Sequence, residues 1–97
     1  MKNRNIAVIN LRNCKYLGEI HKQIKTALNF PEYYGENWDA FWDCLSFDTS
    51  ADYILIYGES TLPIDLKEHL KKMHEILQRC KEERAEYGHK FDFFIMD

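Results

Sequence analysis

Apolar side chains along this chain fall into short strand-like runs separated by longer stretches with helical spacing. Three short runs are rich in β-branched or aromatic residues: NIAVIN at 5–10, DYILIYG at 52–58 and FDFFIM at 91–96. Short apolar runs bounded by turn residues are typical of buried β-strands. The pattern therefore predicts three strands that are far apart in the sequence.

Between the first two runs, apolar residues recur at the i, i+3, i+4 spacing of an amphipathic helix. Residues 16–29 form one such stretch. Pro31 ends it, because a proline moves the residue before it out of the helical region. A second, short helix is predicted for residues 38–46, with Asn37 as its N-cap.

The longest helical stretch covers residues 65–87, and Gly88 is a suitable residue to end it. The spacing does not decide between one helix and two helices with a bend near Leu70. In both cases the same stripe of side chains faces the core. The predicted inner positions are Leu66, Leu70, Met73, Ile76, Leu77 and Cys80.

The order of these elements predicts an α/β fold, in which a small three-stranded, mostly parallel sheet is covered by three to four helices. The length of 97 residues suits a single domain over 1–97. No apolar run is long enough for a membrane-spanning helix, and the N-terminus lacks the apolar core of a signal peptide. Cys14, Cys44 and Cys80 show no metal-ligand spacing, so we expect free, mostly buried thiols and a cytoplasmic protein.

The net charge of −3 is unevenly distributed along the chain. Residues 29–52 contain six acids and no Lys or Arg, whereas the rest of the chain carries ten acids and thirteen bases. Seven of the fourteen aromatic residues lie in the same window. Direct binding to nucleic acid is not expected, because it requires a patch of the opposite charge.

The predicted short helix contains two aspartates, and helix energetics do not account for both of them. Asp39 and Asp43 project from the same side, and Trp42 lies between them and the core-facing side. Like charges at this i, i+4 spacing destabilise a helix by roughly 0.2–0.5 kcal/mol. The helix dipole favours Asp39 near the N-terminus and opposes Asp43 near the C-terminus. Asp43 therefore indicates an interaction surface.

Further aromatic residues surround this acidic pair. Tyr33 and Tyr34 lie in the loop before the short helix, where we expect them to be exposed. Tyrosine and tryptophan are enriched at protein interfaces and at their hot spots. Trp38 is expected both to pack in the core and to contact a partner. Gly35 is expected to supply a positive φ in the loop.

The run PEYYGENWDAFWDCL at 31–45 resembles the signature of the barstar family, the intracellular inhibitors of barnase-like ribonucleases. It departs from that signature only at Trp38 and Phe41, where the family has leucine. Residues 7–10 are similar to the first strand of the family, and His21 falls on a histidine of its first helix. The similarity covers much of the chain, is looser from Phe47 to Lys71 and returns in the last helix around Ile76.

The resemblance implies an inhibitor that blocks the active site of a basic ribonuclease, of extracellular or toxin type, in a 1:1 complex. It assigns enzyme contacts to Tyr33, Asn37, Asp39, Trp42 and Asp43, with Asp43 in the phosphate-binding site as the principal anchor. A glutamate of the last helix also binds in the family, and Glu82 fits that place better than Glu86. The predicted partner-binding surface, with Tyr34 and Trp38 added from the pattern, consists of Tyr33, Tyr34, Asn37, Trp38, Asp39, Trp42, Asp43 and Glu82.

Two alternatives stay open from the sequence. The same fold and acidic side would suit a different basic partner or toxin, and the rim of the surface differs because Phe47 and Asp48 replace a glycine and a tryptophan of the family. An enzyme would use Glu36, Asp39 and Asp43 as metal-binding or acid–base carboxylates. No histidine, lysine or nucleophile can be placed beside them, and no glycine-rich phosphate loop is present. We therefore expect no catalysis, no cofactor and no membrane partner.

Overall fold

The three apolar runs form the three strands of one sheet. In the computed structural model, which describes residues 5–47 and 51–96 apart from the side chain of residue 47, the strands are β1 (Ile6–Asn10), β2 (Tyr53–Tyr57) and β3 (Asp92–Met96). They lie in the order β1-β2-β3, and both pairings are parallel. The prediction of a three-stranded α/β fold is confirmed.

Helices connect the strands in the order that the sequence predicts. They are α1 (Leu17–Leu28), α2 (Trp38–Phe47), the 3-10 turn η1 (Glu59–Thr61) and α3 (Ile64–Glu86). α1 and α2 join β1 to β2, and η1 and α3 join β2 to β3. α3 is one uninterrupted helix, which decides between the two possibilities at Leu70. Among the described helices, none has the length and apolar character to cross a membrane.

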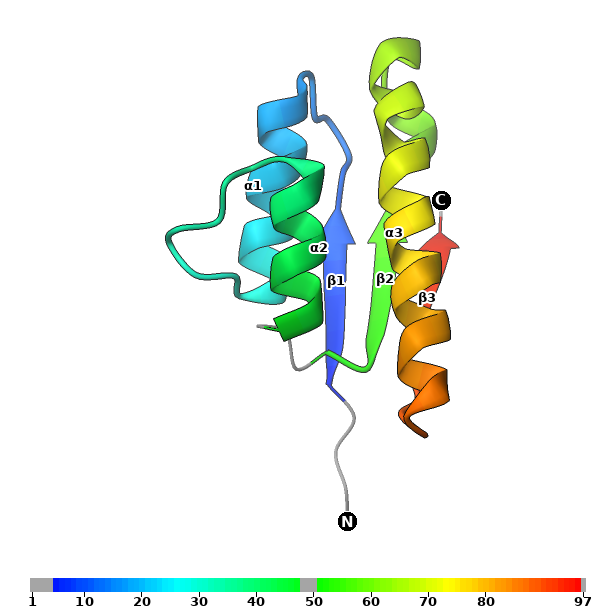
Figure 1. Cartoon of the computed structure of the whole chain (residues 1–97). Coiled ribbons are helices and arrows are strands. Elements are labelled where there is room, and N and C mark those ends of the chain that lie inside the picture. The colour runs from blue at the N-terminus through cyan, green and yellow to red at the C-terminus, as the bar shows by residue number, and fades with distance from the viewer. Residues whose placement is uncertain (1–4, 48–50, 97) are drawn as a thin grey trace.

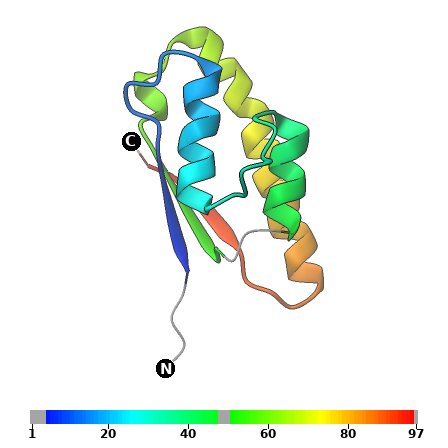
Figure 2. The ribbon, with the colours of Figure 1, turned by 90° about the vertical axis from the view of Figure 1, so that its left-hand side faces the viewer.

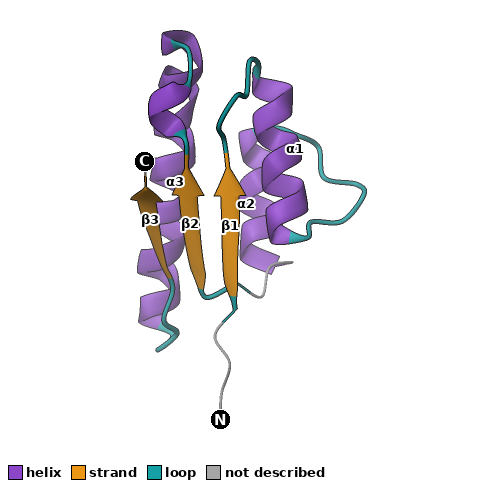
Figure 3. Ribbon diagram, turned by 180° about the vertical axis from the view of Figure 1, so that it is seen from behind, coloured by secondary structure: helices purple, strands orange, loops and turns teal. Residues whose placement is uncertain are grey.

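All three α-helices lie on the same face of the sheet (Figures 1 and 2). Seen from behind, the strands stand in front of the helices (Figure 3). The burial of β1 follows this arrangement, because Ala7 and Ile9 are buried under the helices while Ile6 and Val8 are exposed on the other face. The protein therefore has a helical side, which carries α2, and an opposite side formed by the sheet.

The core lies between the sheet and the helices and contains the predicted side chains. All six inner positions predicted for α3 are buried. Cys14, Cys44 and Cys80 are free and buried, as expected. α3 ends at Glu86 and is followed by Gly88, whose φ is 76°; the His89 N–H donates to the Arg84 carbonyl across that turn, at 2.9 Å.

His21 is the buried polar side chain of α1. Its Nδ1 lies 2.6 Å from the Tyr34 hydroxyl, and its ring packs against Trp38 at 4.4 Å between centroids. Among the described residues, its Nε2 has no hydrogen-bond partner. Burial lowers the pKa of His21 below its ordinary value; nearby Glu36 opposes this shift and His69 reinforces it. The folded protein thus holds His21 as a neutral imidazole that ties α1 to the loop before α2.

Gly58, after β2, is a position where substitution should destabilise the fold. Its φ is 88°, and an added Cβ would lie 2.5 Å from the Arg12 backbone nitrogen. Gly88 also has a positive φ, but an added Cβ there meets nothing within 4 Å. We expect Gly88→Ala to cost about 1–2 kcal/mol from backbone strain alone. Gly58→Ala should cost roughly 1–3 kcal/mol more, because the backbone must also move. Urea unfolding of both variants measures the difference, and equal losses would contradict it.

Stability should fall as the solution is acidified, because His21 is held neutral. The unfolded chain takes up a proton at the ordinary histidine pKa of about 6.5, whereas the folded chain does so only at lower pH. Between those two values the unfolded state binds more protons, so the free energy of unfolding falls by up to about 1.4 kcal/mol per pH unit. Denaturant unfolding between pH 7.5 and 5.5 measures this slope.

The matched control for this pH dependence is His89→Gln, since His89 is exposed after α3 and is not among the groups that shift the pKa of His21. That variant should keep the slope, and His21→Gln should flatten it. NMR of the imidazole in the unmodified protein provides a check that does not depend on the variant folding. Titration of His21 at the ordinary histidine pKa would show the assignment to be wrong.

Candidate partner-binding surface

The N-terminus of α2 is held by Asn37, as the sequence predicts. The Ala40 N–H donates to Asn37 Oδ1 at 2.8 Å, and the Phe41 N–H donates to the Asn37 carbonyl at 2.9 Å. Asn37 Nδ2 in turn donates to the Gly35 carbonyl at 3.3 Å. These bonds satisfy N–H groups that the start of a helix leaves unpaired. Asn37 therefore fixes where the helix begins, whatever else it contacts.

The expectation of a positive φ at Gly35 is wrong. The left-handed residue of this loop is Glu36, with a φ of 53°. Gly35 is needed for space instead, because an added Cβ would lie 3.2 Å from Asn37 Nδ2 and 3.4 Å from the Ala40 Cβ. A side chain at this position would press against the N-cap of α2.

The C-terminal half of α2 is held by Arg84 of α3. The Arg84 guanidinium donates to the Leu45 carbonyl at 2.8 Å and to the Ala51 carbonyl at 3.3 Å, and it stacks over Phe91. A cation at this end of a helix also interacts favourably with the helix dipole. This contact could not be predicted from local patterns, because the residues involved are more than thirty positions apart in the sequence.

The two aspartates of α2 are available to a partner. Asp39 and Asp43 are both exposed. Within residues 5–47 and 51–96, neither carboxylate takes part in a hydrogen bond or an ion pair. In the same part of the chain, no three His, Cys, Asp or Glu side chains form a group that could hold a metal. α2 thus presents two unpaired carboxylates from one side of a helix whose ends are fixed.

The two loop tyrosines have different environments. Tyr33 is 75% exposed, as expected, whereas Tyr34 is only 5% exposed. The expectation that Tyr34 is exposed is therefore wrong. Its ring packs on Phe30 at 5.1 Å, and burial raises the pKa of its hydroxyl, which is bonded to His21. Tyr34 shapes the loop from beneath and offers a partner little surface.

Trp38 and Trp42 are both half-buried, but they point into different parts of the molecule. Trp38 packs against His21 and, edge-on, against Phe41 at 5.7 Å. Trp42 lies under the guanidinium of Arg79 of α3, 4.6 Å from its ring centroid. Arg79 Nε also donates to Glu83 at 3.2 Å. Trp38 thus packs against α1, and Trp42 packs against α3.

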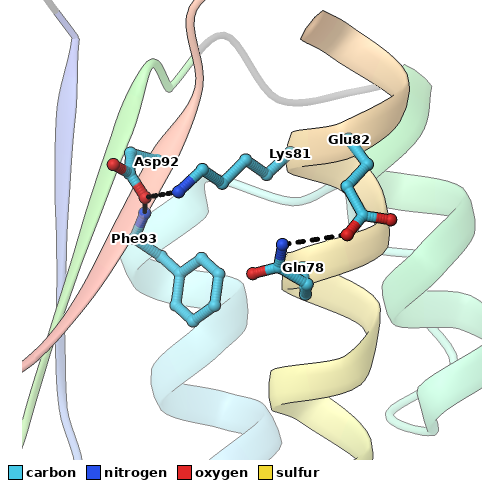
Figure 4. A network of polar contacts seen from close by, with 5 residues as sticks. All are labelled: Gln78, Lys81, Glu82, Asp92 and Phe93. Atoms are coloured by element: carbon cyan, nitrogen blue, oxygen red, sulfur yellow. Dashed lines mark hydrogen bonds and ion pairs between the residues drawn. The ribbon is translucent and has the colours of Figure 1, made fainter.

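Glu82 lies on a different side of α3 from Trp42. It lines an open groove with Phe93 and Ile95 of β3, and its carboxylate accepts a hydrogen bond from Gln78 at 3.0 Å (Figure 4). Figure 4 also shows Lys81 reaching to Asp92, and this hydrogen bond lowers the pKa of Asp92. The acid of α3 that lies near Trp42 is Glu83.

The structure therefore places Tyr33, Asn37, Asp39, Trp42 and Asp43 on α2 and its loop. Glu82 lines a groove on the β3 side of α3, and Arg79 borders both this groove and the side that faces Trp42. Arg79 and Glu83 were missed in the sequence, although their i, i+4 spacing on a helix is a signal for an ion pair. Asp48 of the predicted rim lies outside the described residues, and so does the side chain of Phe47.

Comparison with known proteins agrees with this fold. The sequence profile of the barstar family, described as "Barstar (barnase inhibitor)", matches residues 4–96. A protein of Bacillus subtilis (strain 168) named "Putative ribonuclease inhibitor YrdF" is 29% identical over 85 residues, and the match covers 72% of this chain and 93% of that protein. Since the family profile spans almost the whole sequence, this chain belongs to the barstar family.

Proposed function

We propose that this chain inhibits a basic, barnase-like ribonuclease by placing α2 and its preceding loop in the enzyme's active site. The observation that carries the proposal is the pair of exposed carboxylates, Asp39 and Asp43, which pair with no described residue and lie on a helix fixed at both ends. Membership of a family of non-catalytic inhibitors supports it. The related protein from Bacillus subtilis is likewise named as a ribonuclease inhibitor.

Asp43 is the main anchor in this proposal. A ribonuclease active site binds the phosphates of RNA with cationic side chains, and a carboxylate can take the place of a phosphate oxygen. Arginine meets a carboxylate in a charge-assisted, often bidentate pair. Because α2 is fixed before binding, little conformational entropy is lost when Asp43 is ordered against the enzyme.

The remaining contacts surround this anchor. Asp39 lies one helical turn away, Tyr33 extends from the loop, and Trp42 supplies an apolar surface beside the acids. Asn37 and Trp38 contribute mainly by holding the start of α2, and Tyr34 by supporting the loop. Glu82 would contact a part of the enzyme that extends past α3. The complex contains one copy of each protein.

The uneven charge of the chain favours rapid encounter with a basic enzyme. Opposite fields steer proteins together over distances comparable with the Debye length of about 8 Å at physiological ionic strength. Added salt should therefore slow association more than it speeds dissociation.

Replacing Asp43 should abolish tight inhibition while leaving the fold intact. We expect Asp43→Asn to weaken inhibition more than a hundredfold, because the cations of the enzyme would be buried without their partner, at a cost of about 3–5 kcal/mol. The free protein should be slightly more stable, since a like-charge pair with Asp39 is removed. An inhibition assay against a barnase-like ribonuclease, with urea unfolding of the free variant, measures both effects.

The matched control is Asp65→Asn, which makes the same change of charge at an exposed site in the first turn of α3. It should inhibit within a few-fold of the parent protein. If Asp43→Asn inhibits as well as Asp65→Asn, α2 does not enter the active site.

Substitutions of the two loop tyrosines should have different effects, one on inhibition and the other on the stability of the fold. Tyr33→Ala should weaken inhibition and leave the free energy of unfolding nearly unchanged, because its side chain is exposed. Tyr34→Phe should leave inhibition nearly unchanged and cost about 1–3 kcal/mol of stability, because it leaves His21 Nδ1 buried without a partner. The same assay and unfolding measurements test this, and the reverse assignment would place Tyr34 at the interface.

A further inference from the structure

A pocket of about 410 Å³ opens between α2 and α3, and α2 contributes Trp42 and Ser46 to its lining. Trp42 and the buried Cys80 form apolar parts of its lining, and the strongly exposed Tyr87 lies at its edge. Charged side chains also line it, namely Arg79, Glu83 and Arg84. The pocket therefore combines apolar side chains with three charged ones, two of which are positive.

Arg79 is the basic side chain of this pocket that faces solvent. Its guanidinium stacks on Trp42, and its side chain is 67% exposed. A guanidinium has five N–H donors. Only Nε makes a hydrogen bond among the described residues, to Glu83 at 3.2 Å, so both terminal amino groups point to no acceptor there. Arg84, by contrast, already donates to two backbone carbonyls.

A cation at this place opposes the rest of the surface. Asp43 follows Trp42 in the sequence, and Glu82 and Glu83 lie one turn along α3 from Arg79. Glu83 pairs with Arg79 through Nε alone, so burying the two terminal amino groups against a uniformly basic enzyme would leave them without acceptors and reduce affinity. The charge pattern therefore indicates an enzyme that is basic overall but acidic opposite Arg79.

We propose that the pocket between α2 and α3 receives an acidic side chain of the inhibited ribonuclease, with Arg79 as its counter-ion. This inference rests on the proposed function and adds a contact of reversed polarity to it. The two terminal amino groups of Arg79 bind the carboxylate as a fork. The apolar stem of the incoming side chain packs beside Trp42. A ribonuclease with Lys or Arg at that point is repelled, so Arg79 helps to choose the partner.

The test uses the barnase-like ribonuclease that the unmodified chain inhibits most strongly among several assayed. Arg79→Gln should weaken inhibition about ten- to a hundredfold, as expected for loss of a charged hydrogen-bonded pair, and Arg79→Glu should weaken it more. The matched control is Lys71→Gln, which removes the same charge from an exposed ion pair with Glu68 on the same helix. It should not weaken inhibition, and thermal unfolding should show similar stability for Arg79→Gln and Lys71→Gln.

The opposite result is equally clear. Without an acidic partner group, removing Arg79 makes the surface more acidic towards a basic enzyme, and inhibition becomes equal or tighter. Equal or tighter inhibition by Arg79→Gln overturns the inference. Asp43→Asn, measured in parallel, separates the two levels: if it loses inhibition while Arg79→Gln does not, the active-site plug stands and the pocket contact fails. If the unmodified chain inhibits none of the enzymes, both fail.

A double-mutant cycle identifies the enzyme residue. Exposed Asp and Glu side chains of the ribonuclease are replaced one at a time by Asn or Gln and measured against the unmodified chain and Arg79→Gln. One enzyme variant should show an effect on inhibition that largely disappears when Arg79 is already replaced. Absence of coupling at every acidic position would contradict the inference.

Discussion

The candidate partner-binding surface depends on holding a short, unfavourably charged helix, α2, in place. α2 has ten residues, fewer than an isolated helix needs to be stable in water, and it carries two acids without a base. Asn37 satisfies its first N–H groups, and Arg84 binds the Leu45 carbonyl near its end. Its own side chains Phe41 and Leu45 are fully buried. Tertiary contacts at both ends and on one face therefore offset the repulsion between Asp39 and Asp43.

These contacts come from elements that are distant in the sequence. α1 supplies His21, which holds the loop through Tyr34 and packs against Trp38. α3 supplies Arg84 at the other end and Arg79 above Trp42. The sheet keeps α1 and α3 at a fixed separation, since each packs on the same face. The acidic side of α2 is thus positioned by the whole fold and not by its own local sequence.

The sequence predicted those features that depend on local pattern. Strand and helix periodicity located all the main elements, and the inner stripe of α3 was complete. It could not distinguish Tyr33 from Tyr34, because the direction of a loop side chain is decided by its contact with α1. It likewise missed Arg79, since a long side chain reads as a solvated charge until its neighbour on another helix is known. The position of Glu82 on the β3 side of α3 also required the fold.

The placement of the two tryptophans has a practical consequence. The chain has no others, and both lie in α2, four residues apart. The Trp38 indole packs against the imidazole of His21, while the guanidinium of Arg79 stacks over the Trp42 indole. All intrinsic indole fluorescence of the molecule therefore originates within this one helix. Its emission reports on the environment of α2 without an added label. Replacing Trp42 by phenylalanine leaves only the emission of Trp38, beside α1, and replacing Trp38 leaves only that of Trp42, beside α3.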